Sequence, residues 1–87
     1  MPRYEAFEDS GYTFVFKYDE AFPEMLHYHV RHWPNTIDDA IDTFFADVGT
    51  WDERHQRFIS QSDTHELLWY WIDETKKVVM VISCYRI

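Results

Sequence analysis

Cationic and titratable side chains crowd together at one place in the sequence. The cluster comprises Arg54, His55 and Arg57, and Arg86 follows as the penultimate residue. Metal-free cleavage of RNA needs a base that titrates near neutral pH to activate the 2′-hydroxyl, and cations to stabilise the charge of the phosphorane. These four side chains are therefore the candidate catalytic residues of a ribonuclease. The alternative is a surface set of salt bridges with the two acidic residues that precede Arg54.

Three neighbouring histidines raise the question of a metal site, because imidazoles clustered on one helix are frequent zinc ligands. In a helix the side chains of His27 and His29 point roughly 200° apart, so that only His29 and His32 share a face. A third ligand would have to come from His55, His65 or a carboxylate. We therefore expect no metal site and no cofactor, and solvated or helix-capping histidines instead.

No recognisable catalytic motif accompanies these residues. The sequence has no glycine-rich phosphate loop, no G-x-S-x-G motif and no Cys/His pair at a recognisable spacing. Asp38, Asp39 and Asp42 form an acidic strip on a predicted helix, and paired carboxylates can act as general acid and base inside a cleft. Nothing in the pattern predicts a cleft there, so the strip is typical of a solvated helix face. The sequence therefore favours a protein that is not an enzyme.

The chain is acidic, with 16 Asp and Glu residues against 8 Lys and Arg residues and a net charge of −8. This charge disfavours general binding to a phosphate backbone. An acidic surface can bind a basic partner, such as the nucleic-acid-binding surface of another protein, whose usual ligand it would mimic. The alternative is that the acidic side chains only keep an aromatic-rich protein soluble.

Length and composition predict a single folded domain, residues 1–87, in which residues 1–11 form an extended lead-in. Hydrophobic residues make up 46% of the chain and aromatic residues 20%, which is enough apolar area for a core. The single cysteine, Cys84, excludes an internal disulfide and favours a reducing compartment. Because we find no signal-peptide pattern and no apolar stretch that could cross a bilayer, we expect a cytoplasmic protein without a membrane partner.

Two segments predict helices. Acidic residues followed by Pro23 are typical of a helix start, and Pro34 ends this first helix at about residue 33. The second helix is predicted by a repeat on one helical face, formed by Ile37, Ala40, Ile41, Phe44, Phe45 and Val48. Residues 36–39 resemble a capping box at its start, and Gly49 can supply a left-handed stop at its end.

Four segments predict strands, namely residues 12–18, 56–60, 67–72 and 78–85. The last two are predicted to form a hairpin with a five-residue connection. The predicted fold class is therefore α+β with two layers. An antiparallel sheet of three to four strands carries a helix pair on one face, in the order β-α-α-β-β-β.

Residues 67–72 carry large apolar side chains on both alternating faces, so the sheet face away from the helices needs a cover. A partner protein or a second copy in a homodimer could supply it, or the lead-in and the twist of the sheet could hide those side chains. Trp and Tyr are frequent interface anchors. The predicted partner-binding residues are therefore Trp51, Trp69, Tyr70 and Trp71.

The order of the predicted elements, together with several segments, resembles the BrnT-type toxins of the RelE-like ribonuclease superfamily. The similar segments are residues 16–19, the TIDDAIDTFFAD helix at 36–47, the strand at 57–59 and the VISCYR ending. The resemblance implies a metal-independent ribonuclease toxin held by an antitoxin, with Arg54, Arg57 and Arg86 as its cationic residues. Members of that family are usually basic, whereas this chain carries a charge of −8.

These observations lead to hypotheses of different kinds. The leading hypothesis is a small regulatory domain, inhibitor-like or immunity-like, that binds another protein through an aromatic sheet face and an acidic rim. The alternative is the ribonuclease toxin, with His55 beside the three arginines at the scissile phosphate. A third hypothesis is a mimic of nucleic-acid charge.

Overall fold

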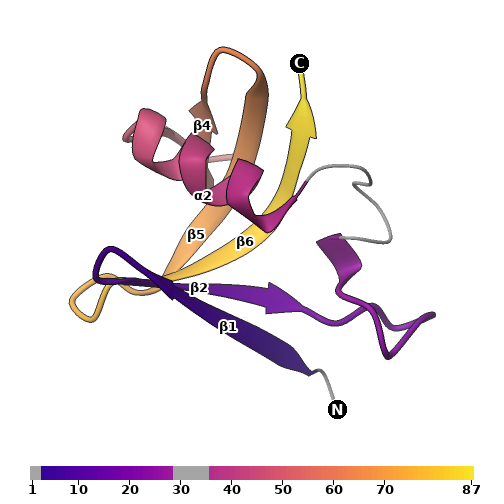
Figure 1. Cartoon of the computed structure of the whole chain (residues 1–87). Helices are drawn as coiled ribbons and strands as arrows, with labels where there is room; N and C mark the ends of the chain where they lie inside the picture. Colours follow the sequence, from indigo (N-terminus) through magenta and orange to yellow (C-terminus); the bar gives the residue numbers. More distant parts are fainter. Residues whose placement is uncertain (1–2, 29–35) are drawn as a thin grey trace.

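One mixed β-sheet of six strands forms most of the molecule (Figure 1). The computed structural model describes residues 3–28 and 36–87. In chain order the elements are β1 (Tyr4–Asp9), β2 (Tyr12–Lys17), α2 (Ile37–Ala46), β3 (Thr50–Asp52), β4 (Arg57–Gln61), β5 (His65–Asp73) and β6 (Val78–Arg86). The strand order across the sheet is β1-β2-β6-β5-β4-β3, and all neighbours are antiparallel except β2 and β6. Helix α2 packs against the part of the sheet formed by β4, β5 and β6.

The predicted architecture, an antiparallel sheet of three to four strands with a helix pair on one face, is wrong. The sheet has six strands and is mixed, and the described residues contain one bounded helix, α2. Where the first helix was expected to begin, the Oδ1 of Asp19 accepts hydrogen bonds from the amides of Ala21 and Phe22, at 2.8 and 3.0 Å. The Asp19 amide donates to the carbonyl of Met25 at 2.8 Å, so that the carboxylate organises a loop and not a helix. Residues 29–35 of the expected helix lie outside the described residues.

Two strands, β1 and β3, were not predicted. β1 occupies the expected lead-in and pairs antiparallel with β2 along its whole length. Ser10 and Gly11 join the two strands with φ angles of 53° and 85°, the geometry of a two-residue hairpin turn. β3 has three residues and places Trp51 opposite Phe58 of β4. Both additions lie at the edges of the sheet.

The other four strands are confirmed, with shifts of a few residues at their ends. Residues 12–17, 57–61, 65–73 and 78–86 form β2, β4, β5 and β6. The β5–β6 hairpin has a connection of four residues, 74–77, and not five. β2 and β6 pair in parallel at three positions, from Thr13↔Val78 to Val15↔Met80.

Helix α2 begins as the capping pattern predicted. The hydroxyl of Thr36 accepts a hydrogen bond from the Asp39 amide at 3.2 Å, and the Asp39 carboxylate accepts one from the Thr36 amide at 2.8 Å. The helix ends before Asp47, whose extended conformation carries Val48 away from the apolar face, so that this side chain is 91% exposed. Gly49 is left-handed, with a φ angle of 88°, but it lies two residues beyond the extended C-cap Asp47 and is not the helix stop that the sequence predicted.

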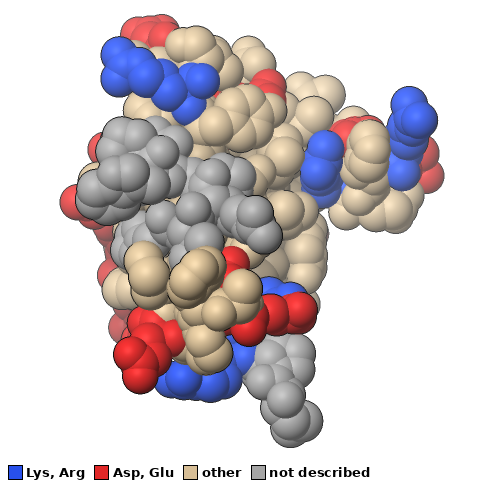
Figure 2. Space-filling model, turned by 90° about the vertical axis from the view of Figure 1, so that its right-hand side faces the viewer, with Lys and Arg blue, Asp and Glu red and all other residues tan. Residues whose placement is uncertain are grey.

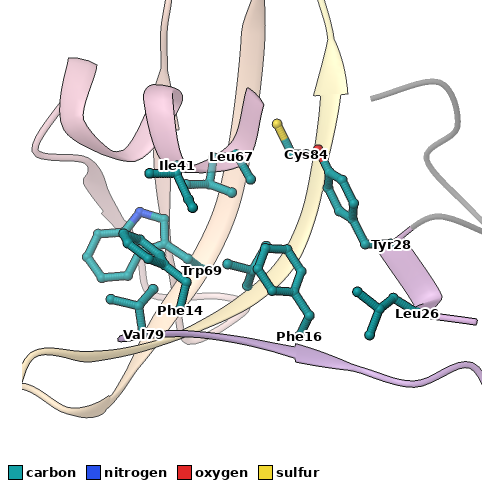
Figure 3. Packing of buried hydrophobic residues seen from close by; sticks show 11 residues of the cluster. Phe14, Phe16, Leu26, Tyr28, Ile41, Leu67, Trp69, Val79 and Cys84 are labelled. Atoms are coloured by element: carbon teal, nitrogen blue, oxygen red, sulfur yellow. The ribbon is translucent and has the colours of Figure 1, made fainter. Parts of the chain in front are cut away.

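The core lies between α2 and one face of the sheet, which we call the helix-covered face (Figure 3). Its side chains include Phe14, Phe16, Ile41, Leu67, Trp69, Val79 and Cys84. The Trp69 ring packs between Phe58, with centroids 4.6 Å apart, and Phe44, with centroids 4.9 Å apart. These contacts join α2 to β4 and β5.

Candidate protein-binding face

The face of the sheet opposite α2 is also apolar, and we call it the open face. The strand register places one row of side chains across it, from Ala6 through Val15 and Met80 to Tyr70. Further apolar members that the register places there are Tyr4, Ile59, Leu68, Val78 and Tyr85. Ile72 and Ile82 lie at the two irregularities of the β5–β6 ladder, and Ile72 is exposed and outside the core. Side chains directly opposite each other on neighbouring strands lie about 5 Å apart, so these rows form a continuous surface.

Several large side chains of the open face remain accessible. The exposed fractions are 50% for Tyr4, 38% for Tyr70, 49% for Ile72 and 37% for Tyr85. Helix α2 packs on the other face and leaves these residues without a helical cover in the described part of the chain. A contiguous apolar patch at the surface usually marks an interaction site.

Acidic side chains border the open face. One row runs from Glu8 through Thr13 and Val78 to Asp73, and so has a carboxylate at each end. Glu66 provides another carboxylate at the opposite end of β5. The same register places Lys17 and Arg57 on this face, and each lies beside a carboxylate, that of Glu20 or Asp52. The open face therefore combines an aliphatic and aromatic centre with a mainly acidic rim.

A cavity of about 320 Å³ lies where β2 and β6 separate. Beyond the three positions at which these strands pair, the gap is lined by Tyr4, Tyr70 and Ile82 and, from the core, by Phe16 and Tyr28. Lys17 also lines the cavity, and its Nζ forms an ion pair of 3.2 Å with Glu20. The cavity gives the open face a recess that can receive a side chain of a partner.

The structure divides the predicted anchors between the two faces. Tyr70 lies on the open face, opposite Met80. Trp69 and Trp71 lie on the helix-covered face, and Trp69 is only 2% exposed. Trp51 is exposed at the β3 edge, where its ring packs on Phe58 and its Nε1 donates a 2.6 Å hydrogen bond to Glu53. Sequence reasoning missed the other accessible residues of the open face, although their alternation with the core residues of β5 and β6 was readable.

Of the predicted catalytic residues, His55 and Arg57 meet at Asp52. The His55 Nδ1 lies 2.9 Å from the Asp52 Oδ2, and the Arg57 Nε lies 3.5 Å from the same oxygen. The hydrogen bond from His55 is the main cause that lowers the pKa of Asp52. Arg54 is exposed in the turn between β3 and β4. Asp52 is one of the two acidic residues that the sequence offered as salt-bridge partners of this cluster, whereas the other, Glu53, accepts the hydrogen bond from the Trp51 indole.

Arg86 lies away from that cluster. It is opposite His65 at one end of the β5–β6 ladder, whereas Arg57 begins β4 and lies next to the Phe58↔Trp69 pair. Five residue steps along β5 separate these levels, which correspond to roughly 16 Å of strand. On the side of the molecule in Figure 2, Lys and Arg side chains likewise form separate groups and not one continuous patch. The structure thus brings together His55 and Arg57 at Asp52, with Arg54 in the adjacent turn, but not Arg86.

The described residues, 3–28 and 36–87, contain no group of three His, Cys, Asp or Glu side chains that could hold a metal ion. His27 lies with its Nδ1 3.1 Å from Asp19 Oδ2, whereas His29 and His32 lie outside the described residues. Burial acts to raise the pKa of Asp19, but backbone hydrogen bonds and the bond from His27 outweigh it, and the pKa is lowered. Within the same residues, no helix has the length and apolarity that crossing a bilayer requires.

No model of a known protein family matches this chain, and neither a characterised protein nor a solved structure shows significant similarity to it. The resemblance to BrnT-type toxins stays a prediction from the segments named above. The function therefore has to be argued from the geometry of the chain itself.

Proposed function

We propose that this protein is a small regulatory domain, inhibitor-like or immunity-like, that binds a basic partner protein through the open face. The observation that carries the proposal is an exposed apolar sheet face bordered by carboxylates. The apolar centre, with Tyr70 and Ile72, would supply binding energy through burial. The rim, with Glu8, Glu66 and Asp73, would select a basic surface and speed its association.

Charge favours a different protein over a second copy as the occupant of the open face. Each copy of the chain has a net charge of −8, and two copies meeting at this face would bring their acidic rims together. Like charges placed opposite each other oppose association. A partner with Lys and Arg around an apolar protrusion matches both features. We also propose that the protein works in a reducing compartment such as the cytoplasm, because its single cysteine cannot form an internal disulfide and lies buried in the core.

The test compares two variants of the tagged chain in affinity capture from a nuclease-treated cell lysate, read by mass spectrometry. Tyr70→Thr combined with Ile72→Thr removes apolar area from the open face and keeps β-forming residues. Val48→Thr is the matched control, since Val48 is 91% exposed and lies outside the sheet. We expect wild type and the control to retain one stoichiometric, basic protein that the double variant loses.

Binding kinetics with the purified partner then separate the role of the apolar centre of the open face from that of its rim. Glu8→Gln and Glu66→Gln should lower the association rate and flatten its dependence on salt, whereas the Tyr70/Ile72 variant should raise the dissociation rate. Equal binding by wild type and the double variant would contradict the proposal. A dimer that the double variant dissociates in analytical ultracentrifugation would also contradict it, because the occupant would be a second copy. If DNA or RNA competes with this protein for the partner, the protein binds as a mimic of nucleic-acid charge.

A ribonuclease toxin is the second candidate, and the contact of His55 with Asp52 favours it. A carboxylate bonded to the Nδ1 of a histidine sets the tautomer and orientation of the ring, as in general acid–base sites. Expression of an active toxin should arrest growth, and Arg57→Ala should relieve the arrest while the protein remains folded. Normal growth with well-expressed wild type would count against this candidate.

A further inference from the structure

A second hollow lies on the helix-covered side, between the end of α2 and strands β2 and β5. Its volume is about 270 Å³, and its lining residues include Tyr12, Phe44, Phe45 and Trp71 together with Asp47. A water molecule occupies roughly 30 Å³ in the liquid, so the space suits a small organic group. We call this hollow the aromatic cleft.

The rings of the aromatic cleft stand at different angles around Tyr12. Tyr12 meets Phe44 and Phe45 edge to face, with centroids 5.2 and 5.4 Å apart. It stacks on Trp71 at 6.3 Å with an interplanar angle of 27°, while Phe44 and Trp71 stand at 89°. These rings pack on one another, and together they bound the cleft. Aromatic faces carry negative partial charge and attract cations.

A cation already lies on one of these rings. The Nζ of Lys77 is 5.2 Å from the centroid of Tyr12, within the range of a cation–π interaction. Lys77 does not belong to the walls of the cleft, so the cleft itself has room for another group. This contact shows that the Tyr12 ring attracts a positively charged group, and Lys77 already occupies that part of the ring.

Asp47 gives the cleft a fixed negative charge. Its Oδ2 accepts a hydrogen bond from the Gln61 amide at 2.9 Å, and its Oδ1 accepts one from the Gly49 amide at 3.2 Å. The bond from Gln61, followed by that from Gly49, lowers the pKa of Asp47, so the carboxylate is charged at neutral pH. No Lys or Arg is among the described residues that line the cleft.

We propose that the aromatic cleft binds an alkylated ammonium group, such as a trimethylammonium group. Its aromatic walls and the charge of Asp47 both favour a cation, and they exclude an anion. A primary ammonium would lose strong hydration on entering, whereas an alkylated one is weakly hydrated and fills an apolar space. The group could belong to a free small molecule or to a methylated lysine of a peptide. The proposal is independent of the open face, which lies on the other side of the sheet.

The test titrates the full chain with choline and with its neutral isostere, 3,3-dimethyl-1-butanol. Binding is followed by tryptophan fluorescence and by the amide resonances of Phe45 and Asp47. The isostere has the shape of choline without the charge, so we expect it to bind at least about fivefold more weakly. A peptide with one trimethyllysine identifies the source of the group, and the same peptide without methylation is its control. Tighter binding of the methylated peptide than of choline indicates a protein ligand. Binding equal to that of choline indicates a free small molecule.

Phe45→Leu removes one wall of the cleft, and Phe22→Leu is its matched control. Both phenylalanines are about half exposed, at 47% and 56%, so neither substitution should unfold the protein, which circular dichroism checks. We expect Phe45→Leu to weaken choline binding at least about threefold, and Phe22→Leu to bind like wild type. Equal affinity for choline and the isostere, or equal affinity of wild type and Phe45→Leu, would overturn the proposal. Absence of binding by choline and by the trimethyllysine peptide would overturn it as well.

Discussion

The indole Nε1 of Trp69 donates a 2.9 Å hydrogen bond to the Oγ of Ser60, and both side chains are buried on the helix-covered face. The bond joins β5 to β4 beneath α2. The sequence predicted Trp69 as an anchor for a partner, but a side chain in this position stabilises the fold. Its loss should change stability before it changes any interaction.

Ser60→Ala should therefore destabilise the protein by about 1–3 kcal/mol, because it leaves a buried indole N–H without an acceptor. Urea unfolding followed by circular dichroism measures the change. In a Trp69→Phe background the same substitution should cost less, since no indole donor remains. Equal costs in the two backgrounds would show that the hydrogen bond is not responsible.

Gly49→Ala should destabilise the protein more than Gly11→Ala. Both glycines have positive φ angles, 88° and 85°, so both substitutions carry backbone strain of roughly 1–3 kcal/mol. A Cβ at Gly49 would lie 2.9 Å from the Ser60 Oγ, whereas one at Gly11 would meet no atom within 4 Å. The difference between the two urea midpoints reports this crowding. It should shrink when Ser60 is also replaced by alanine, and an unchanged difference would contradict the explanation.

Stability should fall in acid partly through Asp47. Its pKa is lowered in the folded protein by hydrogen bonds from the Gln61 and Gly49 amides. An aspartate in the unfolded chain has a pKa of about 3.9. The contribution of Asp47 to stability is therefore complete above that pH, and it is lost as the pH falls through the lower pKa of the folded state. Urea midpoints at pH 7 and pH 3 should differ less for Asp47→Asn than for wild type. Asp63→Asn, at an exposed site, is the control and should show the wild-type difference.

The thiol of Cys84 should react slowly while the protein is folded. The side chain is buried in the core, and burial raises the pKa of the thiol, which lowers the fraction of reactive thiolate. With a water-soluble disulfide reagent, we expect reaction at least roughly 10³-fold slower in buffer than in denaturant, because it requires opening of the core. Similar rates in the two conditions would mean that the core around Cys84 is not closed.

Local signals were sufficient for α2 and for four of the strands. The capping contacts of Thr36 and Asp39 span three residues, and the alternation in β2 spans six, so nearest neighbours alone specify them. The hairpin turn at Ser10 and Gly11 also had a readable signal, which would have revealed β1. The predicted start of the first helix is wrong because the Asp19 carboxylate accepts bonds from amides that a helix start and a loop can use equally well.

The sequence by itself determined that β5 and β6 are strands, that α2 is capped at Thr36, and that the chain is acidic and rich in aromatic residues. Only the tertiary structure decided which alternate residues of β5 are covered. Leu67 and Trp69 pack beneath α2 while Tyr70 and Ile72 face outward, although both sets are apolar. That choice depends on contacts with β2 and α2, which are distant in the sequence, and no local pattern can encode which of two apolar faces a remote helix will cover.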